Sequence, residues 1–272
     1  MKKIKLICCD IDGTLIRDDK SLSQENVRWI RKAVDEKEVL FSIVSGRMYT
    51  ALSHFYDKIH ITGFSSCING TLLMSPDGKV IRNHPINPES AGKVVSVQRK
   101  SNVEMLAVEI DEWFTESREG YLYKSKIGIY RKDCHICSFK KNGLGSIHPN
   151  KLLFMSPDKE KLIGVENEIK LLLSSPDELT FYSGTDFLEI MPSGINKGTG
   201  IDDICGYLGI RHEEVFAIGD DANDIEMFGK VGFPIAMGNA LESARKAAKF
   251  STDTNENDGV AKAIQRFLFD LN

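Results

Sequence analysis

Hydrophobic residues along the chain recur in two patterns that predict two kinds of element. Short, nearly continuous apolar runs predict strands that are buried on both faces of a parallel sheet. These runs lie at residues 4–9, 39–44 and 215–218. After the first run, apolar residues recur at helical spacing, as at Val27, Ile30 and Val34. The order strand, helix, strand, helix predicts an α/β fold built on a parallel sheet.

The pattern changes near residue 64 and returns to its first form after Pro192. Residues 75–79, with the sequence Ser-Pro-Asp-Gly-Lys, separate two apolar stretches and predict a hairpin. From about residue 85 to 190 helical runs alternate with short strands, and within them residues 116–149 give no clear pattern. The simplest interpretation is a discontinuous core domain, residues 1–84 and 191–272, with a second α/β domain, residues 85–190, inserted in it.

The composition is that of an ordinary globular chain, and it excludes some classes of partner. The 272 residues carry a formal net charge of −4. Proteins that bind nucleic acid usually carry an excess of basic residues, which this chain does not have. We therefore expect no nucleic acid among the partners, and positive potential for a phosphate must be created locally. Cys134 and Cys137 form a lone C-x-x-C pair, without a second pair at zinc-finger spacing, so reduced thiols are the simpler interpretation.

The apolar runs are also too short for a membrane protein. None approaches the roughly 18 consecutive apolar residues of a spanning helix. The basic N-terminus lacks the long apolar region and the small-residue cleavage site of a signal peptide. We therefore expect a cytoplasmic protein with no membrane partner, as a monomer or a weak homodimer.

The first of four polar clusters follows the first predicted strand directly and reads Asp10-Ile11-Asp12-Gly13-Thr14. Ligands of open α/β sheets bind at the carboxyl ends of the strands. A carboxylate such as Asp10 can attack phosphorus and hold the phosphoryl group as an acyl phosphate. Asp12 is placed to protonate the leaving oxygen and later to take a proton from water. The structural alternative is an Asp-Gly turn that merely ends a strand.

Two further clusters lie at predicted helix starts. Ser45-Gly46-Arg47 offers a hydroxyl and a backbone amide to a phosphate, although an ordinary N-cap with a surface arginine is the better explanation of this triplet taken alone. Lys197 lies near a helix start, where the helix dipole disfavours a positive charge. That conflict suggests a role in neutralising a phosphate and the Asp10 carboxylate, with a solvated surface lysine as the alternative.

The fourth cluster, Gly219-Asp220-Asp221-Ala222-Asn223-Asp224, follows the strand at residues 215–218. Magnesium prefers oxygen ligands and usually takes only one or two carboxylates from a protein. Asp220 is the candidate ligand. Asn223 and Asp224 are available to bind a phosphate or to hold the metal ligands in place through hydrogen bonds. An acidic loop is often only a loop, but carboxylates gathered after a buried strand reduce stability unless a cation compensates them.

With these four clusters in this order, the chain resembles the hydrolases of the haloacid dehalogenase superfamily, in the Cof-like branch with a class IIB cap. The resemblance runs over nearly the full length. Other segments that carry it are Cys67-Ile68-Asn69-Gly70, Leu188-Glu189-Ile190, Met237-Gly238-Asn239-Ala240 and Asn257-Asp258-Gly259-Val260. It implies a Rossmann-like parallel-sheet core with an inserted α/β cap that closes over the site and selects the leaving group.

The resemblance also implies a role for each site residue of a phosphatase that depends on Mg²⁺. Asp10 would be the nucleophile and a metal ligand, and Asp12 the general acid and base and a ligand through its carbonyl. Asp220 would be the remaining protein ligand, with Thr14 and Asp224 supporting the ligands from behind. The groups that would hold the phosphoryl oxygens are the Ile11 amide, Ser45, Gly46, Lys197 and Asn223.

Three functions stay open on the sequence. The first is hydrolysis of small phosphorylated metabolites, such as sugar phosphates or phosphorylated cofactors. The second is a phosphomutase of the same superfamily, and the third is a non-catalytic phosphoacceptor or metabolite sensor. The presence of Asp12 favours an enzyme, because a phosphoacceptor needs no leaving-group acid. The sequence does not name the substrate; candidates to contact it are Arg47, Tyr182, Asp186 and Phe187.

Overall fold

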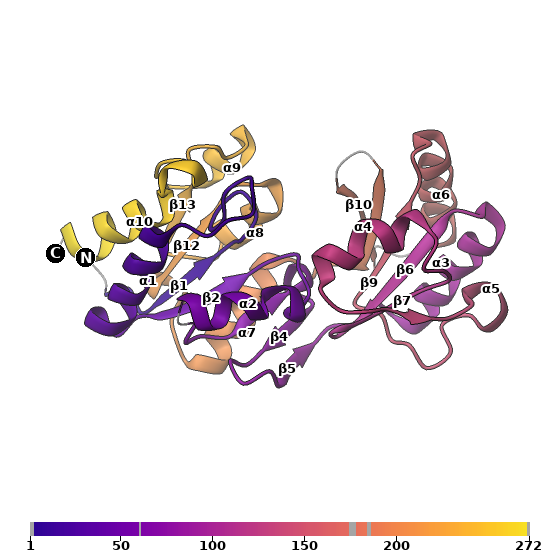
Figure 1. The fold of residues 1–272 in the computed structure, drawn as a ribbon, viewed down its shortest axis with the longest axis horizontal. Coiled ribbons are helices and arrows are strands. Elements are labelled where there is room, and N and C mark those ends of the chain that lie inside the picture. The colour runs from indigo at the N-terminus through magenta and orange to yellow at the C-terminus, as the bar shows by residue number, and fades with distance from the viewer. Residues whose placement is uncertain (1–2, 60, 174–177, 184–185, 271–272) are drawn as a thin grey trace. The chain divides into compact units, whose positions relative to one another are not determined.

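The computed structural model describes residues 3–59, 61–173, 178–183 and 186–270, and these form two compact units (Figure 1). The first unit contains two stretches of the chain, Met1–Arg82 and Asn196–Asn272. The second unit is the segment between them, Asn83–Ile195. The chain therefore leaves the first unit two residues earlier than the sequence pattern predicts, and returns to it five residues later.

The first unit is built on an eight-stranded sheet in the order β14-β13-β12-β1-β2-β3-β4-β5. The strands are β1 (Leu6–Cys9), β2 (Leu40–Val44), β3 (Ser65–Cys67), β4 (Leu72–Met74), β5 (Val80–Asn83), β12 (Val215–Gly219), β13 (Phe233–Ala236) and β14 (Phe250–Ser251). The six strands from β14 to β3 are parallel, and β4 runs antiparallel to β3. All residues of β1 and β12 are buried, as expected for central strands of a parallel sheet covered on both faces.

The helices of this unit lie between its parallel strands or after the last of them. They are α1 (Gln24–Lys37), α2 (Tyr49–Ile59), α7 (Lys197–Leu208), α8 (Ile225–Phe228), α9 (Glu242–Ala247) and α10 (Gly259–Ile264), with a final turn of π-helix at Gln265–Asp270. Ser23 is the N-cap of α1, and its side chain accepts the backbone N–H groups of Glu25 and Asn26. Short 3-10 turns lie at Ile68–Gly70, His212–Glu214, Ala222–Asp224 and Asn255–Asn257.

The second unit is built on a six-stranded sheet in the order β10-β11-β9-β6-β7-β8, antiparallel except where β7 pairs with β8. The strands are β6 (Glu104–Glu109), β7 (Glu112–Thr115), β8 (His135–Ile136), β9 (Lys151–Met155), β10 (Glu178–Ser183) and β11 (Phe187–Pro192). The helices are α3 (Pro88–Ser101), α4 (Tyr121–Tyr130), α5 (Phe139–Asn142) and α6 (Lys159–Leu172).

One face of this second sheet forms a hydrophobic core with three of the helices. Met105 and Ala107 of β6 pack with Val94 of α3, Phe139 of α5 and Leu162 of α6. Helices α3 and α6 also contact each other, and Figure 1 shows them together on this sheet. The four residues from Met105 to Val108 are all buried, and the alternate ones, Met105 and Ala107, face this core.

Residues 116–149, which show no clear pattern in the sequence, form α4, β8, α5 and connecting loops. Their structure depends on distant partners: the Glu104 carboxylate accepts the first N–H groups of α4, from Tyr121 and Leu122. Trp113 of β7 is fully buried and stacks on Tyr123 of α4. Such a segment has no local signal because its capping group and its apolar partner lie elsewhere in the sequence.

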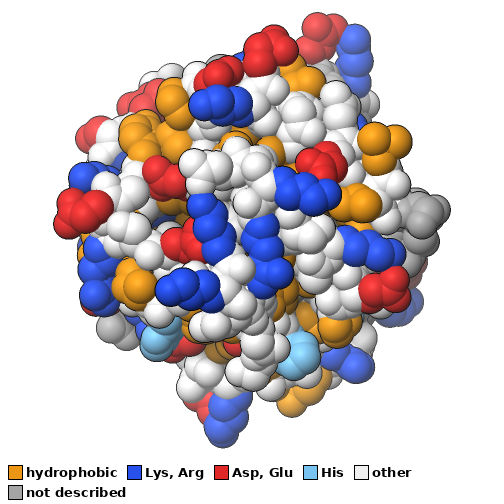
Figure 2. Space-filling model, turned by 90° about the vertical axis from the view of Figure 1, so that its right-hand side faces the viewer, with side chains coloured by type: hydrophobic (Ala, Val, Ile, Leu, Met, Phe, Trp, Pro, Cys, Tyr) orange, Lys and Arg blue, Asp and Glu red, His pale blue; other side chains and the backbone are white. Residues whose placement is uncertain are grey.

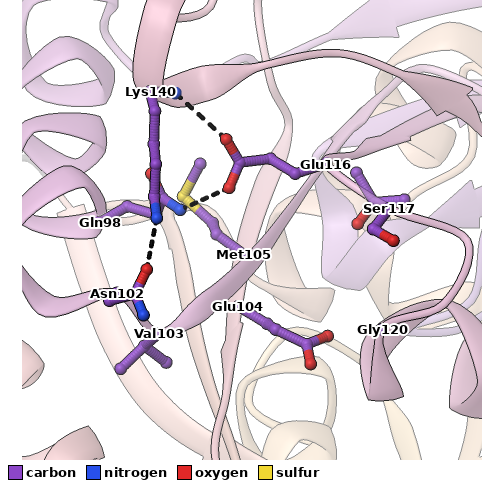
Figure 3. A pocket seen from close by; sticks show the side chains of 10 residues that line it. Gln98, Asn102, Val103, Glu104, Met105, Glu116, Ser117, Gly120 and Lys140 are labelled. Atoms are coloured by element: carbon purple, nitrogen blue, oxygen red, sulfur yellow. Dashed lines mark hydrogen bonds between the residues drawn. The ribbon is translucent and has the colours of Figure 1, made fainter.

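The surface of the second unit includes a polar pocket of about 280 Å³. Figure 3 shows its side chains paired with one another: Gln98 Nε2 donates to Glu116 at 2.9 Å, and Lys140 contacts Asn102. On the face drawn in Figure 2, Lys and Arg side chains gather near the middle, and hydrophobic side chains lie in small groups among the polar ones. Small apolar groups of this kind are ordinary on a folded surface. Among the described residues, no helix is both long and apolar enough to cross a membrane.

Candidate active site

The first polar cluster forms a tight turn at the carboxyl end of β1. The carbonyl of Ile11 accepts the N–H groups of Thr14, Leu15 and Ile16 at 3.0–3.3 Å. Gly13 makes this turn possible, because its φ of 72° lies in the left-handed region. The turn leaves Asp10 at the end of the strand, with a residue exposure of 5%.

Lys197 reaches Asp10 from the start of α7, and it is almost fully buried. The preceding Asn196 caps the helix: its side chain accepts the N–H groups of Gly198 and Thr199. The Lys197 ammonium donates to Asp10 Oδ1 at 2.8 Å and to Asp224 Oδ1 at 2.6 Å. Burial alone would lower the pKa of Lys197, but the two carboxylates raise it above its ordinary value. The lysine therefore stays charged between two buried acids.

Two carboxylates of the fourth cluster complete this group at the end of β12. Asp224 Oδ2 accepts the backbone N–H groups of Asp220 at 2.8 Å and Asp221 at 3.0 Å, so both of its oxygens are engaged. Asp220 Oδ1 accepts the Thr14 hydroxyl at 2.7 Å, which joins the first cluster to the fourth. Carboxylate oxygens of Asp10, Asp220 and Asp224 all lie within 4.8 Å of one another.

The electrostatics of this group favour a divalent cation. Three carboxylates face a single lysine, which leaves excess negative charge in a site where burial is costly. Burial, opposed by Lys197 and reinforced by Asp224, raises the pKa of Asp10 to about 8. Burial also raises the pKa of Asp220 to about 6. Oxygen ligands of this kind suit Mg²⁺, and because both Asp224 oxygens are engaged, Asp10 and Asp220 are the better candidate ligands.

The Asp12 carboxylate points toward a different pair of cations. Arg47 donates to it through two nitrogens, at 2.7 Å and 2.6 Å, and Lys20 donates at 3.1 Å. Partial burial would raise the pKa of Asp12, but these hydrogen bonds hold it below its ordinary value. Asp12 is therefore ionised in this structure, and Arg47 is held at the site rather than exposed as a free surface residue.

The second cluster lies at the end of β2, where Ser45 is buried. Ser45 Oγ accepts the N–H of Arg47 at 3.3 Å, and the Ser45 carbonyl accepts the N–H of Asn69 at 3.0 Å. The position of a Cβ on Gly46 would lie 3.0 Å from Asn69 Oδ1. The same oxygen accepts the Asn223 amide at 3.2 Å. Asn69 thus connects the second cluster to the fourth.

Two residues of this site have no role assigned to them from the sequence. Asn69, in the segment Cys67-Ile68-Asn69-Gly70, adopts the left-handed conformation with a φ of 52°. The Asn-Gly pair is the only local signal for it, and that signal indicates a turn rather than a site. Lys20 also has a positive φ, 67°, at the tip of a small loop, and its sequence gives no sign that it reaches Asp12.

The remaining candidate residues lie in the second unit. The Tyr182 hydroxyl donates to Glu166 of α6 at 3.0 Å, and its ring packs on the hydrophobic core of that unit. The Asp186 carbonyl accepts the N–H of Ser156 at 3.2 Å. The Lys126 ammonium lies 3.8 Å from the centre of the Phe187 ring. Contact of Tyr182, Asp186 or Phe187 with a substrate stays a prediction.

Comparison with known proteins gives consistent results. A family model described as haloacid dehalogenase-like hydrolase matches residues 7–264. The chain is 28% identical to 5-amino-6-(5-phospho-D-ribitylamino)uracil phosphatase YitU of Bacillus subtilis, over 97% of each chain. It is also 28% identical to an HMP-PP phosphatase of Escherichia coli O157:H7, over 89% of this chain and 86% of the relative.

The solved structures include a haloacid dehalogenase-like hydrolase from Bacteroides thetaiotaomicron. It is 29% identical, with a TM-score of 0.87, and the match covers 98% of this chain and all of the other. The resemblance that the four motifs carry is therefore confirmed at the level of family and fold.

Proposed function

The chain belongs to the haloacid dehalogenase-like hydrolases, and from this premise we propose that it is a phosphatase of small phosphorylated metabolites with Asp10 as its nucleophile. The observation that carries the proposal is the buried group in which Lys197 bridges Asp10 and Asp224 while Thr14 holds Asp220. A structural role alone does not explain three carboxylates around one lysine, because unpaired buried charge lowers stability. Both curated relatives described above are named as phosphatases.

The reaction has two steps on the Asp10 carboxylate. An oxygen of Asp10 attacks phosphorus, the bond from phosphorus to the leaving oxygen breaks, and Asp12 gives its proton to that oxygen. Water then attacks phosphorus and gives a proton to Asp12, which releases inorganic phosphate and regenerates the Asp10 carboxylate. The Ile11 amide, Ser45 and the groups near it hold the phosphoryl oxygens; these groups are Gly46, Lys197 and Asn223.

Arg47 has to change partner during this cycle. The ionised Asp12 seen in contact with Arg47 is the form that accepts a proton from water. To act as an acid in the first step, Asp12 must carry a proton, and the Arg47 guanidinium must be released from it. An anionic substrate supplies a competing partner for Arg47, since guanidinium groups form two-point contacts with phosphate as well as with carboxylate.

Mg²⁺ held by Asp10, Asp220 and the Asp12 carbonyl would supply positive charge for the phosphoryl oxygens at the moment of transfer. Thr14 orients Asp220 and two backbone amides orient Asp224. The second unit, as an inserted cap, is proposed to contact the leaving group and choose among substrates. Tyr182, Asp186 and Phe187 are its candidate contacts, and the two relatives are named for different phosphorylated substrates.

Metal removal tests this function directly. Phosphate release from a panel of sugar phosphates and phosphorylated cofactors is expected to require added Mg²⁺ and to fall to background with EDTA. Turnover without any sugar bisphosphate activator would separate a phosphatase from a phosphomutase. Release that is equal with Mg²⁺ and with EDTA would contradict the proposed metal site, and no release across a broad panel would favour the mutase or the sensor.

A methyl group at Gly13 is expected to damage the metal site selectively. The Cβ would overlap the Asp220 carboxylate, whose Cγ lies 2.8 Å from that position, and the φ of 72° is strained for alanine. We expect Gly13→Ala to lower Mg²⁺-dependent turnover by about 10- to 100-fold, the range typical of substitutions in the groups that orient a metal ligand. Gly164→Ala, on the open surface of α6, is the matched control, and equal activity of the two variants would contradict the assignment.

A further inference from the structure

The turn that follows the nucleophile is fastened by two asparagines from the C-terminal part of the chain. Asn239 Nδ2 donates to the Gly13 carbonyl at 2.8 Å, and Asn255 Nδ2 donates to the Ile16 carbonyl at 3.2 Å. The two asparagines are joined to each other, because the backbone N–H of Asn255 donates to Asn239 Oδ1 at 3.0 Å. We call Asn239 and Asn255 the asparagine clasp.

The clasp is part of a longer line of contacts along the same loop. Asn255 also donates to Asp18 Oδ1 at 3.0 Å, and the Asp18 N–H donates to Glu256 at 2.8 Å. Arg17 pairs with Asp258 at 3.3 Å. Asn255 is buried with 3% exposure, whereas Asn239 is exposed. Residues from the C-terminal part of the chain therefore hold the loop after β1 at several successive positions.

The contact at Gly13 acts on the metal site through one peptide unit. The Gly13 carbonyl, which Asn239 holds, belongs to the peptide that joins Gly13 to Thr14. Thr14 in turn holds the Asp220 carboxylate at 2.7 Å. The N–H of Leu241, two residues after Asn239, donates to the Asp220 carbonyl at 2.8 Å. One segment thus fixes Asp220 directly and also fixes the turn that orients its side chain.

We propose that Asn239 and Asn255 are positioning residues of the phosphatase: they fix the turn that carries Asp12 and Thr14 and, through Thr14, the orientation of Asp220. This inference rests on the proposed function for its role in turnover. Neither asparagine is assigned a contact with the reacting atoms. The clasp gives a purpose to Asn239 and the segment around Asn255, which the sequence motifs single out but which the chemistry of the four clusters does not use.

The test compares three Asn→Ala variants of the full chain. For Asn239→Ala and Asn255→Ala we expect the calorimetric Kd for Mg²⁺ to rise about 10-fold, the lower end of the range for groups that orient metal ligands. We expect kcat with Mg²⁺ to fall by a similar factor, while KM for the phosphorylated substrate changes less than about threefold. Asn257→Ala is the matched control, because Asn257 Nδ2 donates within its own segment, to Thr254 Oγ1 at 3.0 Å.

Each outcome decides the inference. Wild-type Mg²⁺ affinity in a folded Asn239→Ala would overturn it, and so would an equal loss in Asn257→Ala, which would indicate a general disturbance of the segment. If the buried Asn255→Ala fails to fold, the exposed Asn239→Ala still decides. Mg²⁺ calorimetry needs no substrate, so a wild-type protein that binds Mg²⁺ but releases no phosphate would refute the proposed function while the clasp is still tested.

A variant with both Asn239→Ala and Asn255→Ala adds a test of the clasp as a unit. Its loss of Mg²⁺ affinity should be smaller than the product of the two single losses, because the two side chains hold one turn together.

Discussion

Asp10→Asn is expected to lower phosphate release by at least about 10⁴-fold, since removal of a nucleophile from a cooperative site costs nearly all of the catalysis. An amide cannot form the acyl phosphate, and the other groups of the site cannot replace it. Folding should be retained, because asparagine has nearly the same shape and removes one charge from a group with excess negative charge. The measurement is phosphate release with Mg²⁺, beside circular dichroism of both proteins.

The control for this variant is the same change at an exposed aspartate. Asp77 lies in the turn between β4 and β5 and pairs with Lys79, so Asp77→Asn should release phosphate at the wild-type rate. A second experiment stops turnover of the wild type rapidly with acid and maps the phosphorylated peptide. We expect one phosphoryl group, on the peptide that contains Asp10. Substantial turnover by Asp10→Asn, or a phosphoryl group on another peptide, would show that the covalent intermediate is wrongly assigned.

The parallel strands of the first unit could be predicted because burial on both faces leaves a continuous apolar run. The same logic predicts where the polar clusters lie, since Asp10 and Asp220 follow such runs and parallel strands end at one edge of the sheet. A local conflict, a positive charge at a helix start, marks Lys197 in the sequence, and the structure places its ammonium against Asp10. Each of these residues can be recognised from the few residues on either side of it in the sequence.

The rest of the site has no such local signal. Asn239 belongs to a segment that carries the family resemblance, but it contacts the turn after β1 only because the fold brings distant segments together. Lys20 reaches Asp12 across a loop whose sequence gives no sign of this contact. Residues 116–149 are similar: the first amides of α4 are capped by Glu104, from a strand that precedes the segment. A sequence pattern reports which face of an element is buried, but it does not report which distant polar group satisfies an exposed backbone end.

Lys197→Met is expected to destabilise the protein strongly in the absence of metal. The change leaves Asp10 and Asp224 buried without the ammonium that bridges them. Removing one partner of a buried ion pair costs about 3–5 kcal/mol, which corresponds to a fall in Tm of roughly 6–20 °C. Lys230→Met, which breaks an exposed pair with Asp202, should cost no more than about 1 kcal/mol. The measurement is thermal unfolding of both variants at pH 8 with EDTA.

The pH dependence of that loss identifies its cause. Burial already raises the pKa of Asp10 to about 8 with Lys197 present, and removing the cation raises it further. A carboxyl group whose pKa is higher in the folded than in the unfolded protein binds more protons when folded, so protonation stabilises the folded state and that stability is lost as pH rises. The deficit of Lys197→Met should therefore shrink between pH 8 and pH 5, and saturating Mg²⁺ should reduce it at pH 8. A deficit that is independent of both pH and Mg²⁺ would instead indicate lost packing, and would remove the argument that excess negative charge makes this a cation site.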